Sequence, residues 1–186
     1  MRLKPFFAAV AVVGALAFNA SALIVGPGSP VVTGDDNSNL SDAQITSLLS
    51  SYSVGPLSAV YQQLLNGAES GSHAGSYTTT FANSPTEPQD ADISFDGGLN
   101  LSGFSDLWLY VKDGTSRPAY YLIDLKTLGW DGESTLQLRG FWPNDGSITQ
   151  VRILGNSSAV PDGGVTVALL AAGLSGLGML RRFISR

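Results

Sequence analysis

Hydrophobic and polar side chains alternate with a period of two through much of the second half of the chain. The strongest alternation covers residues 107–112 and, after the turn-forming Asp113-Gly114, residues 119–125. Alternating runs joined by turn residues are typical of a β-hairpin. Weaker alternation at residues 77–81, 93–95, 136–138 and 151–153 brings the expectation to five or six short antiparallel strands. One face of the hairpin should carry Leu107, Leu109 and Val111, and the other Trp108, Tyr110 and Lys112.

A helical period precedes the strands. Ser41 can cap a helix and Gln44 can complete its capping box, and the apolar residues behind them lie at helical spacing. This pattern predicts one short helix. A second apolar set keeps the same period until Asn66-Gly67, and it fits either a second helix or a loop with one strand. The first set is Ile45, Leu48, Leu49 and Tyr52, and the second is Leu57, Val60, Tyr61, Leu64 and Leu65.

These patterns together predict a mainly β fold. We expect a small antiparallel β-sandwich or curled sheet with one or two short helices laid beside it. Residues 23–39, with two prolines and several glycines, should form extended or turn-rich chain. Residues 23–155 have a length that suits one domain with a single core.

The N-terminus has the three parts of a secretory signal peptide. Arg2 and Lys4 precede an apolar stretch at residues 6–18, and Ala20-Ser21-Ala22 supplies the small residues of a cleavage site. Residues 1–22 are therefore predicted to be a signal peptide that is removed on export.

Charge narrows the choice of partners. The chain has a formal net charge of −5, but residues 23–160 hold fourteen Asp and Glu against five Lys and Arg. A surface this acidic repels nucleic acid. The chain has no cysteine, so an exported domain must be stabilised by packing or bound ions and not by disulfides.

Candidate catalytic groups are few. His73 is the only histidine and stands in a loop of small residues, which favours an exposed loop residue over a catalytic base. A pair of carboxylates could support glycosidase chemistry, but solvated surface charge is the default interpretation. The carboxylates considered are Asp90, Asp92, Asp96, Asp124, Asp131 and Glu133.

Two binding sites are also considered. Residues 35–39 resemble the start of a calcium loop but lack its later glycine and glutamate, so only a looser calcium site or a turn before the helix remains. Aromatic residues on alternating strand positions could form a sugar-stacking face, although core packing is the commoner role. The candidate stacking residues are Trp108, Trp130 and Trp142.

The C-terminus has the layout of a processing signal. A turn-prone motif is followed by sixteen uncharged residues, 165–180, which reach roughly 24 Å as a helix and could barely cross a bilayer. Residues 156–164 are predicted to be a linker with this motif, and residues 165–186 a transmembrane helix with a basic tail. The motif is Val160, Pro161, Asp162, Gly163 and Gly164, and the basic residues after the span are Arg181, Arg182 and Arg186.

This tail resembles the PEP-CTERM class of bacterial sorting signals and, within it, the VPDSG-CTERM subtype. Gly163 stands where the subtype has serine. The resemblance implies recognition by an exosortase, a membrane-bound processing enzyme, with cleavage near the motif. It also implies passage through the inner membrane to the cell surface or extracellular matrix.

We therefore expect a non-enzymatic surface or matrix protein without a cofactor, whose partners are the membrane, the processing enzyme and extracellular polysaccharide. One alternative is a surface-anchored carbohydrate-binding module, assisted by calcium. A second is a secreted hydrolase that uses two carboxylates. In a third, the tail is never cut and serves as a permanent anchor.

Overall fold

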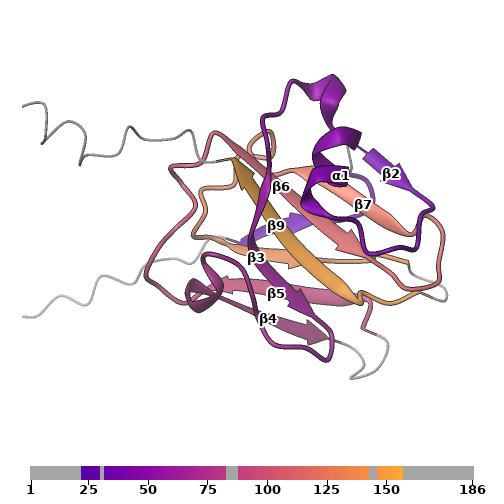
Figure 1. Cartoon of the computed structure of the whole chain (residues 1–186). Helices are drawn as coiled ribbons and strands as arrows, with labels where there is room; N and C mark the ends of the chain where they lie inside the picture. Colours follow the sequence, from indigo (N-terminus) through magenta and orange to yellow (C-terminus); the bar gives the residue numbers. More distant parts are fainter. Residues whose placement is uncertain (1–21, 30–31, 83–87, 143–145, 157–186) are drawn as a thin grey trace, which may run out of the picture.

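The structure, a computed structural model, describes residues 22–29, 32–82, 88–142 and 146–156. Within them nine strands form two sheets, with strand order β1-β8-β5-β4 in one and β2-β7-β6-β9-β3 in the other (Figure 1). The strands are β1 (Ala22–Val25), β2 (Val32–Gly34), β3 (Ser58–Leu64), β4 (Tyr77–Ala82), β5 (Asp90–Phe95), β6 (Asp106–Lys112), β7 (Tyr120–Asp124), β8 (Thr135–Leu138) and β9 (Gln150–Asn156). The helical elements are α1 (Asp42–Leu48), η1 (Ser50–Tyr52) and η2 (Ala74–Ser76).

The two sheets enclose the main hydrophobic core. Leu109 of β6 and Ile153 of β9, which pair in the five-stranded sheet, belong to the same buried cluster as Ile93 of β5 and Leu136 of β8 in the four-stranded sheet. The sheets therefore pack face to face as a β-sandwich, as expected from the alternation.

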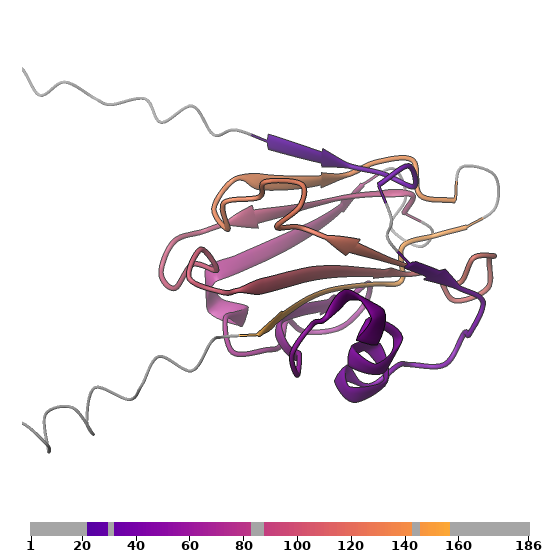
Figure 2. The ribbon, with the colours of Figure 1, turned by 90° about the horizontal axis from the view of Figure 1, so that it is seen from above.

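The outer face of the five-stranded sheet is also buried. Trp108 and Tyr110 of β6 pack with Ile45 and Leu49 from the helical segment in a second apolar cluster. Figure 2 shows α1 on the side of this sheet that faces away from the four-stranded sheet. Strand β6 is consequently covered on both faces. The predicted division of residues 107–112 between two faces is confirmed, with one face in each cluster.

The predicted helix start is confirmed at Ser41. The Ser41 Oγ accepts a hydrogen bond from the backbone N of Gln44, and Gln44 Oε1 accepts one from the backbone N of Ser41. This reciprocal capping box satisfies two backbone donors at the helix start. The α-helix ends at Leu48 and the chain continues into the 3-10 turn η1, so Tyr52 is left exposed and contacts Trp108 only at the edge of its ring.

The second apolar set forms a strand and not a helix. Strand β3 pairs antiparallel with β9, and its register shifts between Ala59 and Tyr61. This irregularity leaves the consecutive residues Val60 and Tyr61 both buried, which breaks the period of two. The apolar spacing therefore resembles that of a helix, and of the two interpretations of this segment the strand is correct.

The purely antiparallel sandwich needs one correction. Strand β1 pairs in parallel with β8, with Leu23 opposite Leu136, while the other strand pairs are antiparallel. Residues 23–39, expected to be extended, thus supply one edge strand to each sheet: β1 to the smaller sheet and β2 to the larger. The sandwich is joined at its N-terminus by a chain that crosses between its layers.

Candidate functional site

The residues of the predicted processing signal lie outside the described part of the chain. This holds for Val160 to Gly164 and for the three terminal arginines, as well as for residues 1–21 of the predicted signal peptide. Among the described residues, no helix is long and apolar enough to cross a membrane.

The three candidate stacking tryptophans do not form an exposed face. Trp108, Trp130 and Trp142 expose 3, 3 and 5% of their surface, and all three pack within apolar clusters. Trp130 Nε1 donates to the Ser134 carbonyl oxygen at 2.7 Å, and Trp142 Nε1 donates to the Pro118 carbonyl oxygen at 2.6 Å. A sugar ring needs an accessible aromatic face, so the sugar-stacking hypothesis for these three residues is corrected: they are core residues.

Four of the six carboxylates considered for catalysis hold turns and strands together, and a fifth, Glu133, accepts a hydrogen bond from the Asn100 side chain. Asp124 accepts hydrogen bonds from the backbone N of Lys126 and Thr127, and Asp131 does the same for Glu133 and Ser134. These backbone donors are the leading cause of a lowered pKa at Asp131, which favours the charged form. A general acid requires the opposite shift.

Asp92 and Asp90 also serve the fold. Asp92 of β5 forms an ion pair, 2.5 Å long, with Arg139, the residue after β8. Asp90 accepts a hydrogen bond from the backbone N of Gly140. No group of three or more His, Asp or Glu side chains in the described ranges is arranged to hold a metal ion.

His73 lies in the loop before η2 and is partly covered. Its ring contacts the ring of Phe104 edge-on, with centroids 5.5 Å apart, and its Nδ1 lies 2.9 Å from the Ser72 hydroxyl. Desolvation lowers the pKa of His73 below its usual value of 6.5. The residue therefore favours the neutral form, and no carboxylate in the described part of the chain forms an ion pair with it.

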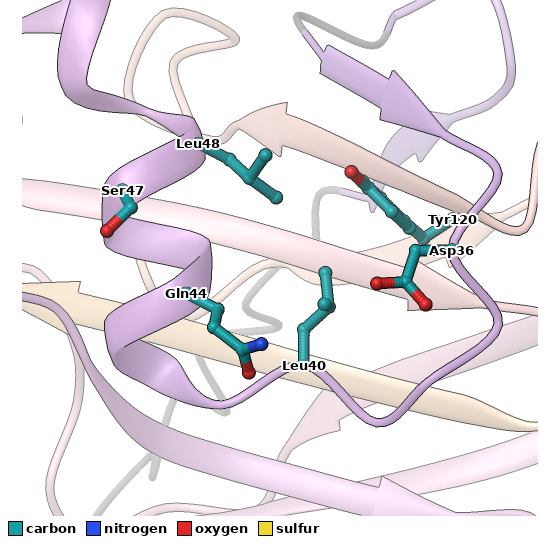
Figure 3. A pocket seen from close by; sticks show the side chains of 6 residues that line it. All are labelled: Asp36, Leu40, Gln44, Ser47, Leu48 and Tyr120. Atoms are coloured by element: carbon teal, nitrogen blue, oxygen red, sulfur yellow. The ribbon is translucent and has the colours of Figure 1, made fainter.

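A pocket that the sequence did not indicate lies between α1 and the chain that leads into it. It is an open hollow of about 370 Å³, lined by the buried Leu40 and Tyr120 and by the exposed Asp36, Gln44, Ser47 and Leu48. Figure 3 shows Leu48 and Gln44 reaching from the helix on one side, and Asp36 and Tyr120 facing them from the other. The helix covers only part of the outer sheet face, and the uncovered part leaves this hollow.

The chemistry of the pocket centres on one carboxylate. A hydrogen bond from the backbone N of Ser38 to Asp36 Oδ1, 2.8 Å long, is the main cause of a lowered pKa at Asp36. Burial is the main cause of the raised pKa values of Tyr110, at about 12, and of Tyr120, and the negative charge of Asp36 adds to both shifts. A hydrolase of the expected type needs two carboxylates, whereas this lining holds one.

Pocket residues could have been suspected only in part from sequence. Asp36 belongs to the polar cluster considered for calcium, and Gln44 to the predicted capping box. Tyr120 lies more than seventy residues further along the chain and comes beside them because β7 pairs with β2, which places Gly34 opposite Tyr120. Such a long-range pairing has no local signal.

The described fold and the tail after it define a class: a β-sandwich domain followed by a C-terminal sorting signal. Residues 159–183 match the family model of the VPDSG-CTERM motif. The protein thus carries a VPDSG-CTERM motif at its C-terminus, which implies an exported substrate of an exosortase-type enzyme with a cell-surface location. No curated protein matches the chain. No solved structure matches it either.

Proposed function

We propose that the protein is a non-enzymatic surface or extracellular-matrix component whose β-sandwich is the cargo delivered by its C-terminal signal. The observation that carries this proposal is the VPDSG-CTERM match at residues 159–183, directly after the folded part. Strand β9 ends at Asn156, so only three residues separate the sandwich from Val160. Three extended residues span at most about 11 Å, and the processing enzyme therefore acts close to the folded domain.

The placement of the chain ends supports delivery from a membrane. Strand β1 begins and strand β9 ends at the same end of the sandwich (Figures 1 and 2). A signal peptide before β1 and a membrane segment after β9 would hold this end toward the bilayer. The opposite end of the sandwich would then face outward in the precursor.

The proposal of a non-enzymatic protein is supported by the contacts of the carboxylates and of the histidine that were considered for catalysis. Four of the six acidic residues considered for catalysis accept backbone hydrogen bonds or form a structural ion pair: Asp90, Asp92, Asp124 and Asp131. The Nδ1 of the single histidine lies beside the Ser72 hydroxyl and not beside a carboxylate. We favour a structural role in the envelope or matrix over a carbohydrate-binding module, because the three tryptophans are buried.

Processing is tested by intact mass and C-terminal peptide mapping of the protein from its native host, with and without the exosortase-type enzyme. We expect a product that ends near residues 160–164 only when the enzyme is present. A double substitution of the motif, Pro161→Ala with Asp162→Ala, should leave the chain uncut, whereas the tether variant Ser158→Ala should be processed normally. An intact Arg186 terminus in the membrane fraction of both strains would contradict the proposal and indicate a permanent anchor.

A further inference from the structure

The pocket beside α1 combines one charge with an apolar wall. Leu40 and Leu48 face its interior in Figure 3. Leu48, the last residue of α1, is an apolar side chain that remains 41% exposed. Leu40 and Tyr120, each 4% exposed, form the floor of the hollow. The volume of about 370 Å³ is within the range of small-ligand sites.

Asp36 is the only charged residue of the lining. The Asp36 carboxylate is ionised at neutral pH, as an aspartate ordinarily is. No Lys or Arg in the described part of the chain forms an ion pair with it. Asp35 differs in this respect, because its carboxylate pairs with Arg117 at 3.0 Å on the surface. The charge that faces the pocket is therefore negative and lacks a counterion.

The buried cations of the same sheet face are held by other groups. Arg152 donates from Nη1 to the Leu40 carbonyl oxygen and to Asp42 Oδ1, each at 3.0 Å. Lys112 donates from Nζ to the Asp113 carbonyl oxygen at 3.1 Å. The positive charge of Lys112 is the smallest of the causes that lower the pKa of Asp36. It therefore stabilises the charged carboxylate slightly but does not form an ion pair with it.

Two polar groups complete the lining. Gln44 Oε1 accepts from the Ser41 backbone N, and in Figure 3 its amide nitrogen turns toward the hollow. The Tyr120 hydroxyl lies so close to Gly34 that a Cβ there would be 2.2 Å from it, so Gly34 is needed for the position of this ring. Nearby, the buried Tyr110 hydroxyl has no hydrogen-bond partner among the described residues.

We propose that this pocket binds a primary ammonium or guanidinium group carried on a short aliphatic stem. The Asp36 carboxylate pairs with the cation, and the exposed Leu48 covers the stem over the largely buried Leu40 and Tyr120. An anion of the same size is repelled by Asp36, and a neutral alcohol loses the ion pair. The cation comes either from a free alkylamine or from a Lys or Arg side chain of a partner protein.

Binding is tested on the full chain in a non-ionic detergent, with n-butylammonium as the probe and n-butanol and butyrate as the neutral and anionic controls. We expect saturable amide NMR shifts at Asp36, Ser38 and Gln44 with n-butylammonium alone. Raising the salt concentration should weaken this binding, because Asp36 is exposed to solvent. Equal shifts with n-butanol, or shifts confined to other parts of the sandwich, would overturn the proposal.

Matched substitutions locate the charge. Asp36→Asn keeps an acceptor for the Ser38 N–H but removes the charge, and it should weaken n-butylammonium binding by about tenfold or more. Asp35→Asn, one residue away and outside the lining, should leave the affinity unchanged. Leu48→Ser should weaken binding of n-butylammonium but not of methylammonium, which lacks the stem. An Asp36→Asn protein that binds as tightly as the parent would refute the site.

Two further probes separate the sources of the cation. An acetylated and amidated Gly-Lys-Gly peptide that binds, while its Gly-norleucine-Gly counterpart does not, would indicate a protein partner. Binding of n-butylammonium and cadaverine without the peptide would indicate free amines. Failure of all the cations would refute the proposal, and it would leave the processing of the tail, which is measured by mass, unaffected.

Discussion

At the scale of single residues, Asp42 connects three elements. Its Oδ1 accepts from Arg152 of β9, and its Oδ2 accepts from the backbone N of Ala59 in β3, at 2.7 Å, from the first turn of α1. Arg152 is 91% buried by side-chain area and its charge faces the ring of Tyr110. Asp42 therefore holds the helix onto the sheet and compensates a buried cation.

Substitution Asp42→Ala should lower the free energy of unfolding by about 2–4 kcal/mol, because Arg152 and the Ala59 N–H would lose their partner. Urea unfolding followed by circular dichroism measures the change. Asp35→Ala removes an exposed ion pair with Arg117 and should cost less than about 1 kcal/mol. Equal effects of the two substitutions would show that the Asp42 network does not stabilise the fold.

His73 gives a residue-level pH dependence. Burial lowers its pKa in the folded state below 6.5, so the unfolded chain binds a proton more readily. The free energy of unfolding should therefore fall as the pH is lowered from 7 through 6.5 toward the folded-state pKa. The single imidazole resonance should titrate below pH 6.5 by NMR. In His73→Gln this part of the pH dependence should disappear, and a folded-state pKa above 6.5 would contradict the assignment.

At the scale of elements, the sequence correctly predicted the helices and strands whose contacts join residues close together in the chain. The capping box at Ser41 and Gln44 lies within one helical turn, and the hairpin of β6 and β7 joins neighbouring segments. The strand β3 was ambiguous, because its register shift against β9 places Val60 and Tyr61 both in the interior. The irregularity breaks the period of two, so the segment's own sequence does not distinguish a bulged strand from a helix; the pairing with β9, about ninety residues away, decides between them.

The turn after Trp130 illustrates a second long-range constraint. Gly129 and Gly132 both have positive φ angles, 75° and 85°. A Cβ at Gly132 would lie 2.8 Å from the Ser102 backbone N, whereas a Cβ at Gly129 would meet no atom within 4 Å. The two glycines therefore share a backbone conformation but differ in their surroundings.

Gly129→Ala should cost about 1–2 kcal/mol for the left-handed backbone alone. Gly132→Ala should cost at least about 1 kcal/mol more, because rigid backbone atoms of the 101–102 segment must shift. Thermal or urea unfolding of the two variants measures the difference. Equal losses of unfolding free energy in the two variants would indicate that the 101–102 backbone shifts to admit the new Cβ at no energetic cost.

At the scale of the whole molecule, the larger sheet is covered on both faces, which brings every tryptophan into the interior. Iodide should quench tryptophan emission weakly in the folded protein and much more strongly after unfolding in urea. Soluble polysaccharides should leave the emission spectrum unchanged, because all three rings are buried and those of Trp130 and Trp142 are also hydrogen-bonded. Strong quenching of the folded protein, or a spectral shift on adding a sugar, would restore the stacking hypothesis.

The sequence by itself determined the signals that are read along the chain. The tripartite tail, the N-terminal leader pattern, the capping box and the alternation of residues 107–112 depend on residues close to one another in sequence. Each of these features depends on the order of residues within a short segment, so it can be identified without knowing how the chain folds. These features therefore gave the VPDSG-CTERM assignment and the mainly β fold.

Only the tertiary structure decided which of the alternating faces met water. The segment from Val32 to Leu57 crosses over the outer sheet face, so it buries Trp108 and Tyr110 and leaves the hollow beside Tyr120. The parallel pairing of β1 and the pocket around Asp36 likewise join residues that are far apart in sequence. Whether a side chain is buried depends on which other segments pack on it. A pattern of period two shows only that the two faces of a strand differ, not what covers each face.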